Sequence, residues 1–293
     1  MKTIASAETS PYSTLISTRV AQPTVVIEAK RSWWQLDLYE LWKYRELIFT
    51  LCWRDIKTRY TQSLIGVGWL LISPLFTIAV MTVIFSYWVK IPSDGVPYPL
   101  FVYSALLPWG YFAKSLERSS TSVANEASLI TKVYFPRVII PIASTLGGLL
   151  DCAIGLVLVI AMGLWFGITP TWGILALPLL LGLALATALA VSLWFTAIHV
   201  RYHDIAAVTA ILVQVWMYAS PVIYPLSMVP EQWRVVYSLN PMVGVIEGFR
   251  WALLGKASPD LLLMAISTVI VFVLLGGGYL FFKKMERTFA DVI

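Results

Sequence analysis

Three charged residues inside an otherwise apolar stretch are the first candidates for chemistry. Lys114, Glu117 and Arg118 are spaced so that they share one face of a helix. Charges inside a membrane segment are costly and indicate function by default. The two cations outnumber the carboxylate by one, which suits a phosphate headgroup and makes Lys114 and Arg118 candidates for binding a lipid phosphate. A self-neutralising cluster near the end of the segment explains the same spacing equally well.

Other groups capable of acid–base chemistry are scattered along the chain. Glu117, Asp151, His203 and Asp204 form no motif, and the sequence identifies no partner for Asp151. Two cysteines and two histidines give neither a disulfide framework nor a metal-binding pattern. We therefore expect no catalytic residue and no metal site, and a protein that is not an enzyme.

The chain also lacks the glycine-rich loop by which many proteins hold nucleoside triphosphates. No G-x-x-x-x-G-K-[ST] motif occurs, because Gly255-Lys256 lacks both the earlier glycine and the following hydroxyl residue. The run Gly276-Gly277-Gly278 lies in an apolar segment, where it favours close helix packing. No cofactor is expected in this chain, and ATP and Mg²⁺, if used, must be bound by another subunit.

Composition indicates the kind of chain that positions these residues. It has 293 residues, of which 59% are hydrophobic and 13% charged, and its mean hydropathy is +0.78. Soluble domains average about 45–50% apolar and about 25% charged residues. These figures exclude a soluble enzyme, a nucleic-acid-binding protein and a disordered regulator, and they predict a polytopic membrane protein.

Long apolar stretches predict an all-α protein with six transmembrane helices. A helix needs about 20 mostly apolar residues to cross a bilayer. The predicted spans are residues 64–89, 98–125, 138–166, 174–198, 205–223 and 261–282. Charges interrupt only the later half of the second span and, at Asp151, the third.

Basic residues set the orientation of these spans. Of the 21 Lys and Arg residues, 15 lie before the first span, in the loops after even-numbered spans, or in the tail. By the positive-inside rule these regions and both termini are cytoplasmic. Met1 to Arg31 lacks the apolar core of a signal peptide and is expected to be a disordered cytoplasmic extension.

Two further segments fit neither a span nor a simple loop. From Trp33 to Tyr60 apolar side chains recur every three or four residues among charges, which predicts an amphipathic helix in the cytoplasmic interface. Pro225 to Lys256, on the external side, predicts re-entrant or interfacial helices. The expected domains are a disordered extension, an interface helix, a six-span domain and a cytoplasmic tail, over residues 1–31, 32–63, 64–283 and 284–293.

Aromatic residues are abundant, with 13 Trp, 14 Tyr and 13 Phe. Belts at the two membrane interfaces account for many of them. Phe76, Trp194, Trp216 and Tyr218 lie deeper in their predicted spans. Aromatic faces with polar tips suit sugar rings, so these side chains are candidates for a path along which a glycan slides. Core packing is the alternative for each of them taken alone.

Four separated stretches resemble a known family. In chain order they are Arg54–Tyr60 continuing through Gln62–Trp69 to Pro74, Leu129–Arg137, Asn240–Met242 with Glu247–Arg250, and Met285–Ile293. They resemble the ABC-2 type permeases that export polysaccharides and polyol phosphates, and the likeness runs from about residue 38 to the end. The N-terminal extension falls outside it.

This resemblance implies the transmembrane subunit of an ATP-driven exporter in the bacterial inner membrane. Such permeases are homodimers that work with two copies of a separate ABC ATPase subunit, which binds ATP and Mg²⁺, and no nucleic acid is involved. The implied substrate is a polyprenyl-diphosphate-linked polysaccharide, O-antigen first, with capsular polysaccharide or teichoic acid as alternatives. Alternatives of other classes are a membrane-embedded glycosyl- or acyltransferase and an ion-coupled transporter, although no internal repeat supports the latter.

The resemblance also assigns the segments that meet the ATPase. In relatives these are the interface helix and the loop between the second and third spans. Here that loop is Asn125–Arg137, called the docking loop below. The implied ATPase-coupling residues are Arg54, Asp55, Arg59, Leu129, Lys132, Tyr134 and Arg137.

Channel and gate residues follow in the same way. Spans one and five line the channel in relatives, which makes Phe76, Trp216 and Tyr218 glycan-channel candidates. The external re-entrant helices between spans five and six act as a gate in relatives. The corresponding residues here are Trp233, Asn240, Pro241, Glu247 and Arg250.

Overall fold

The computed structural model describes residues 38–61, 66–169, 171–202, 204–255 and 260–289, which all belong to one compact unit. These described residues form helices joined by turns and contain no β-strand, so the all-α prediction is confirmed. The predictions for residues 1–31, for both ends of the interface helix and for the last residues of the tail lie outside the described residues.

The helices follow one another closely along the chain. The first are α1 (Leu38–Lys43), α2 (Arg45–Thr61), α3 (Trp69–Met81), α4 (Tyr98–Asn125), α5 (Ala127–Ile130), α6 (Ile139–Leu146) and α7 (Leu149–Trp165). They are followed by α8 (Leu177–Arg201), α9 (Ile205–Tyr218), α10 (Glu231–Tyr237), α11 (Pro241–Leu254) and α12 (Leu261–Glu286). Short 3-10 or π-helical turns are η1 (Gly66–Gly68), η2 (Thr82–Trp88), η3 (Trp172–Ala176) and η4 (Leu226–Met228).

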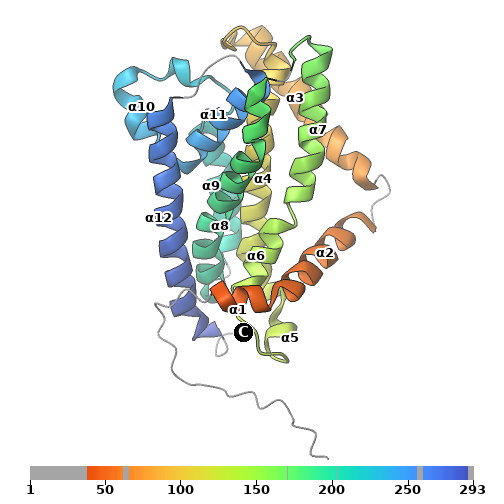
Figure 1. Cartoon of the computed structure of the whole chain (residues 1–293), viewed down its shortest axis with the longest axis vertical. Coiled ribbons are helices and arrows are strands. Elements are labelled where there is room, and N and C mark those ends of the chain that lie inside the picture. The colour runs from red at the N-terminus through yellow and green to blue at the C-terminus, as the bar shows by residue number, and fades with distance from the viewer. Residues whose placement is uncertain (1–37, 62–65, 170, 203, 256–259, 290–293) are drawn as a thin grey trace, which may run out of the picture. The chain divides into compact units, whose positions relative to one another are not determined.

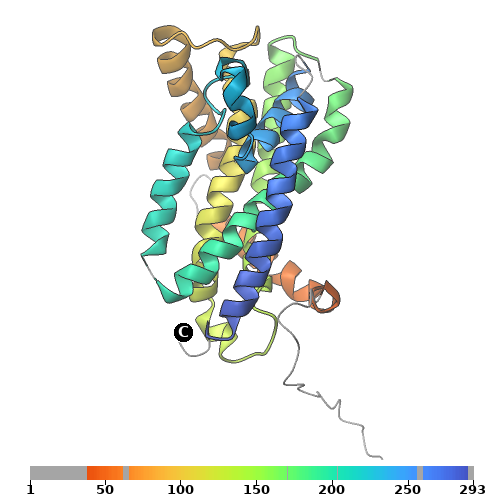
Figure 2. The same cartoon turned by 90° about the vertical axis from the view of Figure 1, so that its left-hand side faces the viewer.

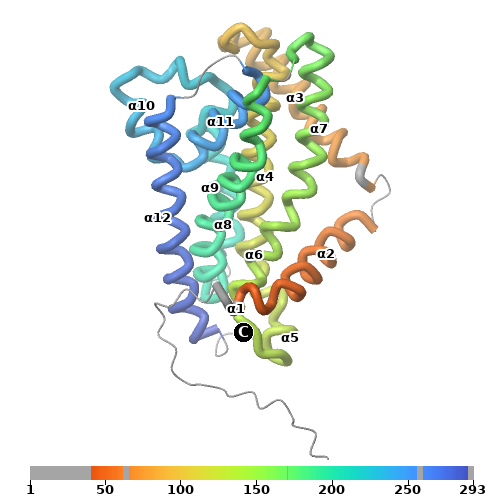
Figure 3. Tube along the Cα trace, in the orientation of Figure 1, coloured from red at the N-terminus to blue at the C-terminus, as the bar shows by residue number. Residues whose placement is uncertain are grey.

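Three long helices, α4, α8 and α12, lie side by side (Figures 1 and 2). Near one end of them α2 crosses obliquely and α5 lies close by, and near the other end are α10 and α11, as the trace in Figure 3 also shows. The segments predicted to be cytoplasmic are therefore gathered at one end of the bundle and the predicted external helices at the other.

Four helical segments are long and apolar enough to cross a membrane, whereas the sequence predicts six. They are residues 69–88, 139–165, 172–201 and 261–286. α4 has the length, but its tyrosines, serines and charged residues make it too polar to count as a span by composition. α9 has only 14 residues, about 21 Å at 1.5 Å per residue, against a hydrocarbon core of about 30 Å. The six-span count is therefore not confirmed.

α4 nevertheless lies in the middle of the core. Its side chains Phe101, Tyr103 and Phe112 are almost fully buried in the large apolar cluster to which α8 and α11 contribute. On the same helix the carbonyl of Ser119 accepts a hydrogen bond from Oγ1 of Thr196 on α8 at 2.8 Å. Small hydroxyl residues let two helices approach closely and bond across their interface. Ser119, one of the serines that lower the hydropathy of α4, is thus covered by α8.

The third predicted span consists of two helices, α6 and α7, separated by Gly147 and Gly148. A Cβ atom on Gly147 would lie 2.9 Å from Nη2 of Arg59, and one on Gly148 would lie 2.8 Å from Nη2 of Arg118. Both contacts are closer than real Cβ atoms show, so the two glycines admit two guanidinium groups. The break in the span thereby brings arginines from α2 and α4 against it.

The predicted interface helix consists of α1 and α2, which meet at Tyr44. Leu51 on α2 is buried in an apolar cluster at this end of the bundle. Trp42, Phe49 and Trp53 are exposed. Within the described residues, α1 and α2 therefore bury apolar side chains against the bundle and also leave aromatic side chains exposed on their surface.

The glycine run of α12 packs closely on α8. A Cβ atom on Gly278 would lie 2.8 Å from Nε1 of Trp194. The same Nε1 donates to the carbonyl of Leu274 at 3.0 Å, and the indole stacks on Phe281 with ring centroids 4.8 Å apart. Trp194 is therefore a packing residue between two helices.

Candidate functional site

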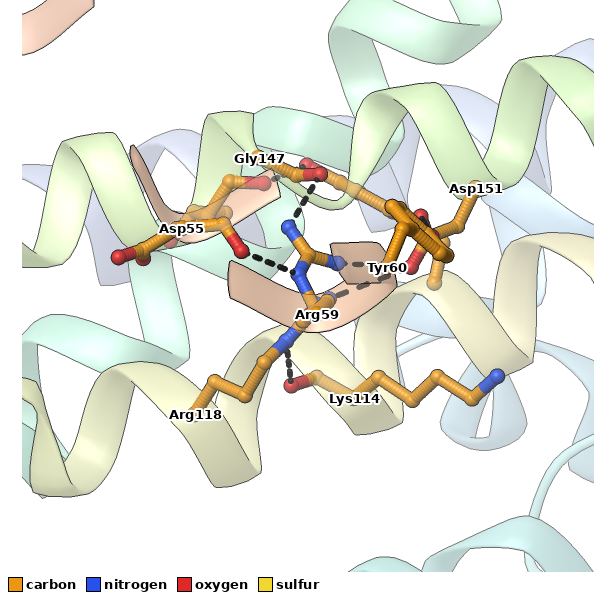
Figure 4. Close-up of polar contacts among 9 residues, drawn as sticks. Asp55, Arg59, Tyr60, Lys114, Arg118, Gly147 and Asp151 are labelled. Atoms are coloured by element: carbon orange, nitrogen blue, oxygen red, sulfur yellow. Dashed lines mark hydrogen bonds and ion pairs between the residues drawn. The ribbon is translucent and has the colours of Figure 1, made fainter. Parts of the chain in front are cut away.

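Asp151 of α7 gathers polar side chains from two other helices (Figure 4). One carboxylate oxygen accepts a hydrogen bond from Nη1 of Arg59 at 2.9 Å and lies 3.7 Å from Nη1 of Arg118. The other oxygen accepts a hydrogen bond from the hydroxyl of Tyr60. Arg59 and Tyr60 lie in the last turn of α2, and Arg118 lies on α4. The carboxylate for which the sequence identifies no partner thus joins α2, α4 and α7.

Arg59 also bonds the backbone of two helices. Its Nε donates to the carbonyl of Asp55 at 3.1 Å, and its Nη2 donates to the carbonyl of Gly147 at 2.8 Å. The last carbonyls of a helix have no partner within that helix. The guanidinium therefore caps the end of α6 while it pairs with Asp151 of α7.

Two guanidinium groups share the single carboxylate of Asp151, and all three side chains are largely covered, with 15% of the Asp151 side chain exposed. The pKa of the Tyr60 phenol is raised to about 12. Burial is the larger cause, and the hydrogen bond to Asp151 is the second. The phenol therefore keeps its proton and acts as a donor. Arg118, at 3.7 Å from the carboxylate, is held less tightly than Arg59.

The charged groups of Lys114 and Arg118, the predicted phosphate pair, point in different directions (Figure 4). Nε of Arg118 donates to the carbonyl of Lys114 at 2.9 Å, and its guanidinium turns toward Asp151. Figure 4 shows the ammonium of Lys114 pointing away from the Asp151 cluster. Arg118 therefore shares a counter-ion with Arg59, whereas Lys114 is exposed.

A cavity of about 380 Å³ lies beside the Asp151 cluster. Residues of α2, α4 and α6 line it together with Glu126, and its charged lining comprises the cations Arg54, Arg59 and Arg118 and the carboxylates Asp55 and Glu126. Guanidinium groups bind carboxylate and phosphate oxygens through charge-assisted hydrogen bonds. Because Glu126 is paired with Arg54, the side of the cavity formed by Arg59 and Arg118 can hold an anionic group next to the break in the third predicted span.

Arg54 of α2 makes a two-point ion pair with Glu126, which precedes α5. Nη1 donates to Oε2 at 3.3 Å, and Nη2 donates to Oε1. The hydrogen bond to Glu126 raises the pKa of the Arg54 guanidinium above its usual value, so the arginine stays charged. Bidentate contacts of this kind fix geometry as well as adding energy. Through this pair α2 holds the first turn of the docking loop, and the Asp55 carboxylate lies 3.6 Å from Nη2 of Arg54.

The docking loop is anchored near its ends and open in the middle. Leu129 is partly buried and packs on the apolar cluster at this end of the bundle, and Phe135 is fully buried in it. Lys132 is exposed, and 90% of the Tyr134 side chain is exposed. An aromatic side chain held out in this way suits contact with another protein, because interfaces are enriched in tyrosine.

Arg137 joins the far end of the docking loop to the end of α12. Its backbone N–H donates to Oε1 of Glu286 at 2.7 Å, and its Nη1 donates to the carbonyl of Glu286 at 2.9 Å. Its guanidinium also lies 5.9 Å from the ring centroid of Phe289, which packs edge-on against Phe282. Arg137 is therefore engaged within the chain, unlike Tyr134.

At the opposite end of the bundle, Asn240 organises the start of α11. Its Oδ1 accepts hydrogen bonds from the N–H of Met242 and from Nε1 of Trp216, each at 3.0 Å. Its Nδ2 donates to Oγ of Ser220 at 2.8 Å. The side chain caps the helix, with Pro241 in the first helical position, where its missing N–H costs nothing. It also ties α11 to the end of α9.

The three glycan-channel candidates differ in their surroundings. Phe76 on α3 is 73% exposed and Tyr218 on α9 is 54% exposed. Trp216 is partly buried, donates to Asn240, and packs edge-on against Phe112 with ring centroids 5.2 Å apart. Phe76 and Tyr218 are thus available to line a path, whereas Trp216 is also a packing residue.

Glu247 and Arg250 form the expected i, i+3 pair on α11, at 2.9 Å. Nη2 of Arg250 donates to the carbonyl of Val222 at 3.0 Å, and the guanidinium lies 3.9 Å from the ring centroid of Phe101. Arg250 is buried and Glu247 is partly buried, and the pair holds the turn after α9 against α4. Trp233 on α10 is exposed and does not belong to this group.

Sequence reasoning misses the partners that anchor the docking loop. Arg54 and Glu126 are 72 residues apart, and Arg137 and Glu286 are 149 residues apart, so no local spacing connects them. A signal does exist for Glu286, because it lies in one of the four stretches that carry the family likeness.

The described residues contain no group of three or more His, Cys, Asp or Glu side chains that could hold a metal ion. His203, one of the scattered acid–base candidates, lies outside the described residues.

Comparison with known proteins agrees with the likeness seen in the sequence. The model of the ABC-2 type transporter family matches residues 46–254. The O-antigen export system permease protein RfbA of Myxococcus xanthus is 29% identical over 258 residues, which cover 87% of this chain and 98% of that protein. The protein of the same name from Klebsiella pneumoniae is 24% identical over 260 residues, with the same coverage. The polysialic acid transport protein KpsM of Escherichia coli is 24% identical over 205 residues, 69% of this chain and 78% of that protein.

Proposed function

The chain belongs to the ABC-2 type transporter family, and we propose that it is the permease subunit of an ATP-driven exporter of lipid-linked polysaccharide. It works with two copies of a separate ABC ATPase subunit, which bind and hydrolyse ATP with Mg²⁺. The permease itself is a homodimer without an ATPase site. Its substrate is a polyprenyl-diphosphate-linked polysaccharide, and O-antigen is the first choice.

One observation carries this proposal. The two segments assigned to the ATPase by resemblance, α2 and the docking loop, are joined by the Arg54–Glu126 ion pair. An ATPase can move a permease only through docked elements that are rigid enough to transmit force. A loop held by Arg54 at one end and by Glu286 at the other, with Tyr134 exposed between them, meets that need.

The choice of O-antigen rests on the relatives. Two of them, each matched over 98% of its length, are named as O-antigen export permeases. The shorter match to a polysialic acid transport protein favours a capsular polysaccharide as the second candidate. Teichoic acid remains a third candidate from the sequence resemblance. A membrane-embedded transferase would need convergent acid–base groups, and Asp151 is instead held by Arg59 and Arg118.

We further propose that the protein lies in the bacterial inner membrane with both termini in the cytoplasm. The end of the bundle that carries α2 and the docking loop then faces the ATPase, and α10 and α11 form an external gate. Exposed apolar side chains on α3 and α9, among them Phe76 and Tyr218, face the second copy and the glycan path between the copies.

The lipid phosphate would enter beside the Asp151 cluster. Arg118 lines the cavity there, and the exposed side chain of Lys114 can turn toward an incoming phosphate. Arg118 is the better of the two candidates because Asp151 holds it less tightly than it holds Arg59.

The experiment that tests the function is deletion of the gene, followed by fractionation and sugar analysis of lipid-linked glycans. Export predicts that finished polymer accumulates on the cytoplasmic side, and its composition identifies the substrate. Polymer that is missing or truncated in every fraction would instead indicate a synthetic enzyme and would contradict the proposal. Complementation with the intact gene controls for effects on neighbouring genes.

A further inference from the structure

We propose that α12 transmits movement of the docking loop to the external helices α10 and α11, with Glu286, its last residue, and Ser267, in its second turn, as positioning residues. The proposal rests on the function proposed above, in which the docking loop meets the ATPase. It adds a route through the bundle and names the residues on which that route depends.

The first step is the contact between the docking loop and α12. Glu286, the last residue of α12, accepts the backbone N–H of Arg137 at 2.7 Å, and its own carbonyl accepts Nη1 of Arg137 at 2.9 Å. Two bonds between the same two residues restrict rotation as well as distance. Phe289, just beyond the helix, is fully buried against Phe282 and covers this junction. A shift of the loop at Arg137 is therefore passed to α12.

The second step is the stiffness of α12. The helix is continuous from Leu261 to Glu286, 26 residues or about 39 Å at 1.5 Å per residue. Its weak point is the run of glycines at 276–278, because glycine lowers helix stability. Trp194 braces that point, since its Nε1 donates to the Leu274 carbonyl at 3.0 Å and its ring stacks on Phe281.

The third step is the contact between α12 and the external helices. Oγ of Ser267 donates to the carbonyl of Ser238, which ends α10, at 2.8 Å, and Ser267 is 1% exposed. A Cβ atom on Gly244 of α11 would lie 2.8 Å from Cβ of Ser267, so the two helices are in close contact here. The Ser238 carbonyl lies two residues before Asn240, which caps α11. A displacement of α12 thus reaches both external helices at one point.

A chain of contacts alone does not establish energetic coupling, because the coupling could also spread through α4 and α8. The two routes make different predictions for combined substitutions. If α12 carries the signal in series, weakening a second point on it adds little to the effect of the first. If the two points act independently, their effects multiply.

The experiment uses the permease purified together with its ATPase subunit in nanodiscs, and a deletion strain that expresses each variant. The two readouts are the ATPase rate of the complex with lipid-linked polysaccharide extracted from the deletion strain, and the amount of polymer that reaches the cell surface. The amount of surface polymer divided by the ATPase rate, called the export ratio below, measures the coupling between hydrolysis and export. A merely structural role would lower the amount of complex and leave this ratio unchanged.

We expect Glu286→Ala to keep ATPase activity within about twofold of wild type and to lower the export ratio by at least ~5-fold, the lower end of typical coupling between sites. Glu286→Gln keeps an oxygen that can accept the Arg137 N–H, and it should retain most export. Arg287→Ala, at an exposed neighbouring position, is the matched control and should behave as wild type. Ser267→Ala should lower the ratio in the same direction, and the double variant should be no worse than the more severe single variant.

Wild-type coupling in Glu286→Ala, or multiplied losses in the double variant, would overturn the route through α12. Should Glu286→Ala fail to assemble, Ser267→Ala and Trp194→Phe carry the same test away from the docking loop, and normal coupling in both would overturn it. Failure of the wild-type permease to bind an ATPase subunit at all would instead contradict the proposed function.

Discussion

Arg54 and Glu126 join two segments that lie 72 residues apart in the sequence, through two hydrogen bonds between one guanidinium and one carboxylate. The pair is partly open to solvent, with 48% of the Arg54 side chain exposed. An exposed ion pair adds less than about 1 kcal/mol to the free energy of unfolding. Its importance is therefore geometric, because it fixes the start of the docking loop, just after α4, against α2.

The first prediction follows from that geometry. Arg54→Ala should leave the amount of folded permease unchanged and should lower the coupling of ATP hydrolysis to export. The exchanged pair Arg54→Glu with Glu126→Arg should restore much of the loss, because the same two groups meet again. The ATPase rate and the surface polymer of each strain measure this. Lys57→Ala, at an exposed position on the same helix, is the control. If Arg54→Ala and the exchanged pair show the same ratio of surface polymer to ATPase rate, the ion pair does not contribute to coupling.

The second prediction concerns the carboxylate shared by two arginines. Asp151→Asn leaves Arg59 and Arg118 without a counter-ion in a partly buried site. We expect the free energy of unfolding to fall by about 1–3 kcal/mol, less than for a fully buried pair because water reaches the arginines. Thermal unfolding of the purified protein in detergent measures the change. Glu117→Gln removes an exposed carboxylate from α4 and should have little effect. A stable Asp151→Asn variant would show that the cluster does not hold α2 in place.

The third prediction concerns Gly148, one of the two glycines at the break in the third predicted span. Gly148→Ala places a Cβ atom 2.8 Å from Nη2 of Arg118 and 3.1 Å from the ring of Tyr111. Crowding of this kind costs about 1–3 kcal/mol. Gly182→Ala, inside α8, meets nothing within 4 Å and should stabilise the helix by about 0.5–1 kcal/mol. Opposite shifts of the unfolding temperature are therefore expected, and equal shifts would contradict the close approach of Arg118.

Sequence patterns predict the helices well where the apolar run is long. The sixth predicted span, residues 261–282, is α12, Leu261–Glu286, and the fourth, residues 174–198, lies within the helical segment 172–201. The break at Gly147 was not predictable, because it depends on guanidinium groups that arrive from α2 and α4. The sequence predicts α4 as a span from its length, but α4 is too polar to count as one by composition. The contact by which Thr196 of α8 covers Ser119 depends on tertiary packing, which hydropathy does not record.

The candidate site is predictable in part for the same reason. Motif likeness selects Arg54, Tyr134 and Arg137 as residues, but it does not reveal their partners. Arg137, which the resemblance implies is an ATPase-coupling residue, bonds Glu286 in its own chain, a partner that the motif does not reveal. Contacts between residues more than 70 positions apart follow from tertiary packing, which no local pattern records.

The fourth prediction separates the exposed residue of the docking loop from the engaged one. Tyr134→Ala should lower the affinity for the ATPase subunit about 10- to 30-fold, the effect of losing one interface hot spot worth about 2 kcal/mol. Its stability should not change, because the side chain is 90% exposed. Adding Arg137→Ala also removes the side-chain bond to the Glu286 carbonyl, although the backbone N–H bond remains, and the double variant should hydrolyse ATP without exporting. Trp172→Ala, an equally exposed aromatic position outside the docking loop, is the control for both measurements. Wild-type export by the double variant would remove the coupling assignment.

The last prediction distinguishes a glycan path from core packing among the aromatic residues. Trp216 donates to Asn240 and packs on Phe112, so Trp216→Ala should lower the amount of folded protein as well as export.

Phe76 is 73% exposed and Tyr218 is 54% exposed, so Phe76→Ala and Tyr218→Ala should fold normally. If these two side chains line the path, each loses contacts with passing sugar rings worth about 0.5–1.5 kcal/mol, and export of long chains should slow about 2- to 10-fold. The length distribution of surface polymer, compared at equal permease levels, measures this. Trp88→Ala, exposed at the far end of η2, controls for loss of an aromatic side chain in the same span. Unchanged polymer length in both variants would show that α3 and α9 face lipid at these positions, and the path would then have to follow other helices.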